Sequence, residues 1–121
     1  MSRRILVVED HEDNRQILRD LLASGGLDMI EAEKGEQTIA AAEANHPDLI
    51  LMDIQLPIVD GYEATRRIKA NPALRAIPII VVTSYALSGD EDKARAAGCD
   101  DYITKPYSPR ALLAKINQHL R

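Results

Sequence analysis

Short runs of apolar residues recur along the chain, and each run is followed by a polar or charged residue. Ile5–Val8, Leu49–Met52 and Ile79–Val82 are continuous apolar runs of four residues. A short run of this kind, without alternation, is typical of a strand that is buried on both faces, as in a parallel sheet. Two further strands are predicted at Asp28–Glu33 and Asp101–Thr104, where mixed polarity indicates less buried positions, and the second suits a sheet edge.

The segments between these runs carry the spacing of amphipathic helices. In the first helix a predicted capping box of Asp13 and Gln16 marks the start, and Gly25-Gly26 marks the end. Its apolar stripe consists of Ile17, Leu18, Leu21 and Leu22. Four more helices are expected at 35–45, 60–71, 88–97 and 108–120, the last three with Asp60, Ser88 and Ser108 as N-caps.

The alternation of five strands with five helices determines the predicted fold class. It predicts an α/β fold in which a parallel sheet is covered by helices on both faces through right-handed crossovers. The length of 121 residues supports one hydrophobic core and therefore one domain over residues 1–121. Because the sequence ends with the last helix, we expect no attached output domain.

Composition narrows the classes of function that remain. The net charge is −4 and there is no basic block, which argues against a nucleic-acid surface. The single cysteine, Cys99, excludes a disulfide framework and a cysteine-based metal site. No apolar run approaches the ~18 residues of a membrane span and the amino terminus has no signal-peptide core, so a cytoplasmic protein is expected. Since there is no Trp or Phe, the core must be aliphatic.

Polar residues whose side chains could take part in binding or catalysis follow or end the predicted strands. They are Glu9, Asp10, Asp53, Thr83 and Lys105. In a parallel sheet these ends share one edge, the carboxyl edge, where open α/β sheets build their sites. An all-oxygen set of carboxylates suits Mg²⁺, and one Mg²⁺ with Lys105 would balance the three acidic charges. A carboxylate such as Asp53 can act as a nucleophile and become an aspartyl phosphate.

The motifs together resemble the receiver domain of bacterial two-component response regulators, a member of the CheY-like superfamily, over essentially the whole chain. The matching segments are Val7-Val8-Glu9-Asp10, the run from Asp48 to Asp53, Leu56-Pro57 with Asp60-Gly61, Val82-Thr83, and Lys105-Pro106. The resemblance implies a flavodoxin-like sheet of strand order 2-1-3-4-5. It also implies that Asp53 accepts a phosphoryl group from a phosphohistidine on a sensor histidine kinase or a histidine phosphotransfer protein.

The same resemblance assigns roles to individual residues. Mg²⁺ would be bound by Glu9, Asp10, Asp53 and the backbone carbonyl of Gln55. Lys105 would contact the phosphoryl group, with a cis bond to Pro106, while Thr83 and Tyr102 would be the switch residues. They would reshape the face formed by the fourth helix, fifth strand and fifth helix for a downstream protein target, as a monomer or a phosphorylation-dependent dimer. Gln55 and Tyr85 match positions that tune dephosphorylation, and Tyr85 is bulky for its position.

Other interpretations stay open on the residues alone. A magnesium-dependent phosphohydrolase would also use Asp53, but such enzymes usually place an acid where this chain has Gln55, which cannot donate a proton as an acid. A receiver-like interaction module that is never phosphorylated is a third possibility, although all five key side chains are present. A nucleotide site is disfavoured, because no glycine-rich loop follows the first strand. His11 lies near the site and is expected to be a solvated loop residue.

Overall fold

The chain alternates strands and helices throughout the part that the structure describes. This computed structural model describes residues 3–53, 61–83, 90–105 and 107–120. Its elements are β1 (Arg4–Val8), α1 (Glu12–Ser24), β2 (Asp28–Ala32), α2 (Gly35–Asn45), β3 (Leu49–Asp53), α3 (Gly61–Ala70), β4 (Ile79–Thr83), α4 (Asp90–Ala97), β5 (Asp101–Thr104) and α5 (Pro109–His119). The predicted order of elements is confirmed.

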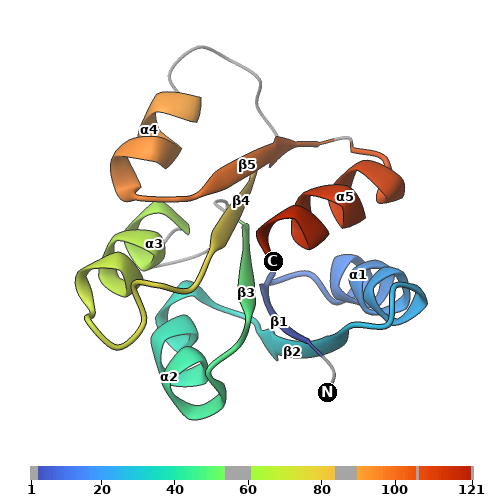
Figure 1. Ribbon diagram of the computed structural model, residues 1–121, viewed down its shortest axis with the longest axis horizontal. Helices are drawn as coiled ribbons and strands as arrows, with labels where there is room; N and C mark the ends of the chain where they lie inside the picture. The colour runs from blue at the N-terminus through green and yellow to red at the C-terminus, as the bar shows by residue number, and fades with distance from the viewer. Residues whose placement is uncertain (1–2, 54–60, 84–89, 106, 121) are drawn as a thin grey trace.

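The five strands form one parallel sheet. Their order is β2-β1-β3-β4-β5, and each neighbouring pair is parallel. Figure 1 shows α1 and α5 on one face of the sheet and α2, α3 and α4 on the other. The doubly wound, flavodoxin-like architecture and the strand order are therefore confirmed, and β5 lies at an edge as expected.

The core is aliphatic and lies in two layers, one on each face of the sheet. Alternate residues of β3 divide between them: Ile50 and Met52 pack toward α2 and α3, whereas Leu49 and Leu51 pack toward α1 and α5. All five residues of β3 and of β4 are buried. Burial on both faces is what makes these strands read as continuous apolar runs. Packing on both faces of the sheet therefore fixes the carboxyl ends of β3 and β4.

The helices begin at the predicted N-cap residues only in part. Ser108 caps α5 by accepting a hydrogen bond from the Ala111 N–H, with Pro109 in the first turn, as predicted. The predicted start of α1 is wrong, because the helix begins at Glu12 with His11 as N-cap and Asp13 inside the first turn. The predicted caps Asp60 and Ser88 lie outside the described residues. None of the helices in the described ranges is long and apolar enough to cross a membrane.

Candidate functional site

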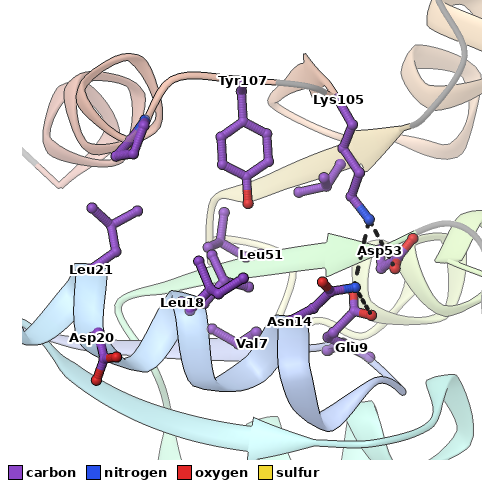
Figure 2. A pocket seen from close by; sticks show the side chains of 14 residues that line it. Val7, Glu9, Asn14, Leu18, Asp20, Leu21, Leu51, Asp53, Lys105 and Tyr107 are labelled. Atoms are coloured by element: carbon purple, nitrogen blue, oxygen red, sulfur yellow. Dashed lines mark hydrogen bonds and ion pairs between the residues drawn. The ribbon is translucent and has the colours of Figure 1, made fainter.

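The parallel sheet brings three of the predicted site residues into contact at its carboxyl edge. Glu9 and Lys105 directly follow β1 and β5, and Asp53 and Thr83 end β3 and β4. Lys105 Nζ lies 3.6 Å from Asp53 Oδ2 and 4.0 Å from Glu9 Oε2. Figure 2 shows the lysine reaching from the end of β5 toward both carboxylates. Glu9 is 3% exposed and Asp53 6% exposed, so two acidic groups are desolvated beside one ammonium group.

Glu9 is held in place by hydrogen bonds from the start of α1. Its Oε1 accepts from Asn14 Nδ2 at 3.1 Å and from the His11 N–H at 3.3 Å. Burial opposes ionisation of this carboxyl, but hydrogen bonding with Asp53 and Asn14 and the charge on Lys105 outweigh it and hold the pKa of Glu9 below its usual value. Glu9 therefore favours the charged form that a metal ion requires.

A buried arginine supports the backbone at the same point. Arg15 Nη1 donates to the Glu9 carbonyl at 2.8 Å, and its guanidinium is also paired with Glu12 and Glu31. A guanidinium this buried is tolerated because each of its edges meets an acceptor. Sequence reasoning missed both Asn14 and Arg15. Their spacing from Glu9 carries no signal until α1 has been placed across the end of β1.

Asp10 has an oxygen that fits a cation. Asp10 Oδ1 is buried and accepts no hydrogen bond of good geometry from the described residues, although His11 Nδ1 lies 3.0 Å away. A buried carboxylate oxygen in this state is costly unless a cation satisfies it. Glu9, Asp10 and His11 each offer a ligand atom within 4.8 Å of the others. The donor set is therefore compatible with a divalent ion, and the predicted carbonyl ligand of Gln55 lies outside the described residues.

The two predicted switch residues lie on neighbouring strands. Thr83 is buried at the end of β4, and its carbonyl accepts a hydrogen bond from the Lys105 N–H at 2.7 Å. Tyr102 is half-buried on β5 and packs against the core layer on the α2 and α3 side. The Arg95 guanidinium lies 5.8 Å from the centre of the Tyr102 ring. Tyr85 and the bond to Pro106 lie outside the described residues.

A mostly apolar cavity of about 660 Å³ opens beside Asp53, between α1 and α5. Its apolar lining includes Val7, Leu18, Leu21, Leu51, Val82 and Tyr107. Figure 2 shows the Tyr107 hydroxyl pointing into this space. Burial, reinforced by the charges of Glu9 and Asp53, raises the pKa of Tyr107, so the phenol stays protonated.

The cavity also corrects one prediction about α1. Ile17, predicted to lie in the buried stripe with Leu18, is 62% exposed and lines the cavity. Sequence reasoning missed the cavity because a stripe of apolar residues looks the same whether a neighbouring helix fills the space beside it or leaves it open.

Comparisons with known proteins agree with this geometry. The family model for the response regulator receiver domain matches residues 5–117. The chain is 42% identical to the polar-differentiation response regulator DivK of Brucella ovis over 120 residues, 99% of this chain and 98% of that protein.

Two solved structures are similar along nearly the whole chain. One is the receiver domain of a sensor histidine kinase from Pseudomonas aeruginosa PAO1, described with a magnesium ion coordinated in its active-site cleft (TM-score 0.92, 37% identity, 99% of this chain and 98% of that one). The other is the signal receiver domain of a histidine kinase from Syntrophus aciditrophicus (TM-score 0.92, 31% identity, 98% and 90% covered).

Proposed function

The chain belongs to the response regulator receiver domain family, and from that premise we propose that it is a signalling switch whose Asp53 accepts a phosphoryl group in a magnesium-dependent reaction. The donor is a phosphohistidine on a sensor histidine kinase or a histidine phosphotransfer protein. The observation that carries the proposal is the buried Asp53 carboxylate with Lys105 Nζ at 3.6 Å. A desolvated carboxylate beside a cation is poised for phosphoryl transfer, which depends on positioning and charge neutralisation.

Each residue at the carboxyl edge has a distinct part in the proposed reaction. An Asp53 oxygen forms the new bond to phosphorus as the phosphorus–nitrogen bond of the phosphohistidine breaks, and the imidazole departs with the bonding electron pair. Lys105 neutralises charge on the phosphoryl oxygens, and Thr83 Oγ donates a hydrogen bond to one of them. Glu9, Asp10, Asp53 and the Gln55 carbonyl would hold Mg²⁺, which supplies further charge neutralisation when bound.

The cavity between α1 and α5 offers a protein donor a docking surface that a small phosphodonor does not need. Its apolar walls and the exposed Ile17 side chain lie beside Asp53. An apolar surface next to a reactive group is typical of a protein contact site. A partner that seats an apolar side chain there would bring its phosphohistidine to Asp53.

The proposed output is a change of protein contacts. Phosphorylation adds roughly −1.5 to −2 of charge at the carboxyl edge. Thr83 and Tyr102 respond from adjacent strands and alter the face formed by α4, β5 and α5 for a downstream target, in a monomer or a phosphorylation-dependent dimer. The protein then acts as a regulator that catalyses only its own phosphorylation and dephosphorylation. In this proposal residues 1–121 form the receiver domain, and the protein works in the cytoplasm, where phosphohistidine is formed from ATP.

The direct test is the intact mass of the protein after incubation with Mg²⁺ and acetyl phosphate. We expect one phosphoryl adduct, stable in acid and labile in base, that is lost in Asp53→Asn. The matched control is Asp48→Asn, which changes the carboxylate that accepts the Arg4 N–H just before β3 begins and should keep the adduct. An adduct that survives Asp53→Asn contradicts the proposal, and repeated turnover of a phosphomonoester would favour a phosphohydrolase instead.

A further inference from the structure

His11 places a ring nitrogen beside the first two carboxylates of the site. Its Nδ1 lies 3.2 Å from Glu9 Oε1 and 3.0 Å from Asp10 Oδ1. Around an octahedral ion with bonds of about 2.1 Å, adjacent ligand atoms are about 3.0 Å apart. Both separations are close to the spacing of adjacent ligands on one ion, and the 3.2 Å separation is also that of a hydrogen bond.

The Nδ1 atom of His11 can donate a hydrogen bond to only one of the two carboxylate oxygens beside it. A neutral imidazole carries at most one proton on Nδ1, and that nitrogen faces two acceptors. Glu9 Oε1 already receives hydrogen bonds from Asn14 Nδ2 and from the His11 N–H. Asp10 Oδ1 is the buried oxygen that receives none of good geometry in the described ranges. A cation between these atoms would satisfy all of them at once.

The His11 ring is also accessible to an ion from solvent. His11 is the N-cap of α1, but its side chain makes no capping hydrogen bond within the described chain. The His11 side chain is 70% exposed, so solvent ions reach it directly. Helix capping and core packing do not hold the ring; it is held by the two carboxylates, through a hydrogen bond between Nδ1 and Glu9 Oε1 and a close approach to Asp10 Oδ1.

We propose that His11 is a metal ligand that gives this acidic cluster an affinity for nitrogen-preferring divalent ions, such as Co²⁺, Ni²⁺ and Zn²⁺, beside its affinity for Mg²⁺. The inference deepens the proposed function, because it rests on the metal site of that proposal. Mg²⁺ takes oxygen ligands and retains water, whereas imidazole nitrogen favours the later transition metals. One nitrogen added to two carboxylates thus changes ion selectivity and leaves the magnesium ligands in place.

The test compares Co²⁺ with Mg²⁺, which are similar in size and both adopt octahedral coordination. Affinities are measured by calorimetry on wild type, His11→Phe and His46→Asn. Because the hydrogen bond with Glu9 and the charge of Asp10 raise the pKa of His11 above the ordinary imidazole value of ~6.5, the pH is set well above that value so that protons do not compete. His11→Phe keeps a ring but removes the donor. His46→Asn is the matched control, because His46 is exposed at a positive φ that Asn tolerates. Proton NMR of the Co²⁺ form gives a second readout in the shifted signals of a coordinated imidazole.

We expect His11→Phe to weaken Co²⁺ binding by about tenfold or more and to abolish the shifted ring signals, while Mg²⁺ affinity stays within about twofold. His46→Asn should change neither affinity. Equal Co²⁺ affinity in wild type and His11→Phe, or shifted signals that persist in the variant, overturns the inference and leaves the proposed function standing. Failure of wild type to bind Mg²⁺ counts instead against the proposed function.

Discussion

Two lysine–aspartate pairs lie at opposite edges of the same sheet, and they differ in how completely each lysine is satisfied. At the amino edge, Lys69 Nζ lies 2.8 Å from Asp100 Oδ2 and also donates to the carbonyls of Arg75 and Ile77 at 3.1 and 3.0 Å. Asp100 Oδ2 further accepts the Ile79 N–H at 2.8 Å. This pair joins α3 to the starts of β4 and β5 and leaves the ammonium group with three acceptors.

At the carboxyl edge, Lys105 Nζ stands 3.6 Å from Asp53 and 4.0 Å from Glu9, beyond ordinary hydrogen-bond length. The same residue types therefore form a closed structural pair at one edge and a spaced cluster with surplus acid at the other. This excess of acidic groups costs stability unless a cation neutralises it. In this protein the loosely spaced pair, and not the short one, lies at the proposed site.

The largest expected effect comes from replacing each lysine by methionine, which keeps the apolar stem and removes the charge. Lys105→Met should slow phosphorylation of Asp53 by about 10²–10³-fold, because a charge-stabilising donor is lost, and should change the free energy of unfolding by less than about 1 kcal/mol. Lys69→Met should leave the phosphorylation rate unchanged and lower the free energy of unfolding by about 1–3 kcal/mol. Rates are measured by intact mass with acetyl phosphate, and stability by urea unfolding.

The two lysine variants are thus expected to differ in opposite ways, one in phosphorylation rate and the other in stability. Lys69 is 18% exposed, so water replaces its lost contacts only in part. If both variants lowered stability equally and both kept the phosphorylation rate, the carboxyl edge would be a second structural pair. The difference between the two edges would then have no functional meaning.

Replacing Asp53 or Asp100 should change the free energy of unfolding in opposite directions. In magnesium-free buffer, Asp53→Asn should raise the free energy of unfolding by roughly 1 kcal/mol, because it removes one of the two desolvated acidic groups that crowd this edge. Asp100→Asn should lower it by a similar amount, because the charged acceptor of Lys69 and of the Ile79 N–H is lost. Urea unfolding of both variants beside wild type measures the two changes. A loss of stability in Asp53→Asn would show that the acidic cluster is already balanced without a metal ion.

The strand ends of the site could be predicted from the sequence because a parallel sheet leaves little freedom. Once β1, β3 and β4 were recognised as buried strands and β5 as an edge strand of the same parallel sheet, Glu9, Asp53, Thr83 and Lys105 had to share an edge. The structure places Glu9, Asp53 and Lys105 in contact there. Chain topology alone supplied that much, whereas the roles of these residues remain predictions.

The features that depend on the position of α1 could not be predicted. The Asp13 cap was a reasonable local choice, but the helix starts at Glu12 with the Arg15 N–H donating to the His11 carbonyl at 3.0 Å. Hydrogen bonds to Glu9 from Asn14 and Arg15 fix that start, and they form only when α1 lies across the end of β1. The exposure of Ile17 has the same origin, because it reflects the open space between α1 and α5.

The smallest expected effect concerns Asp101, the third aspartate that lies near a lysine. Its Oδ1 lies 3.2 Å from Lys115 Nζ and its Oδ2 lies 3.0 Å from His119 Nε2, both on α5. Burial opposes ionisation, but the hydrogen bonds from His119, the Tyr102 N–H and Lys115 outweigh it and hold the pKa of Asp101 below its usual value. Like the Asp100 pair, this cluster is closed and is expected to be structural.

Because the folded-state pKa of Asp101 is lowered, its stabilising contribution is present above the unfolded-state value of about 3.9 and is lost as the pH falls through the folded-state value. Asp101→Asn should therefore be less stable than wild type by about 1 kcal/mol at neutral pH. The gap should hold as the solution is acidified and should begin to close only near pH ~4. Urea unfolding across this range measures the gap. The rate of Asp53 phosphorylation at neutral pH serves as the control and should not differ between the variant and wild type. A gap that closes well above pH ~4 would mean that Asp101 is not held ionised by its partners on α5, and that short ion pairs in this protein are not all structural.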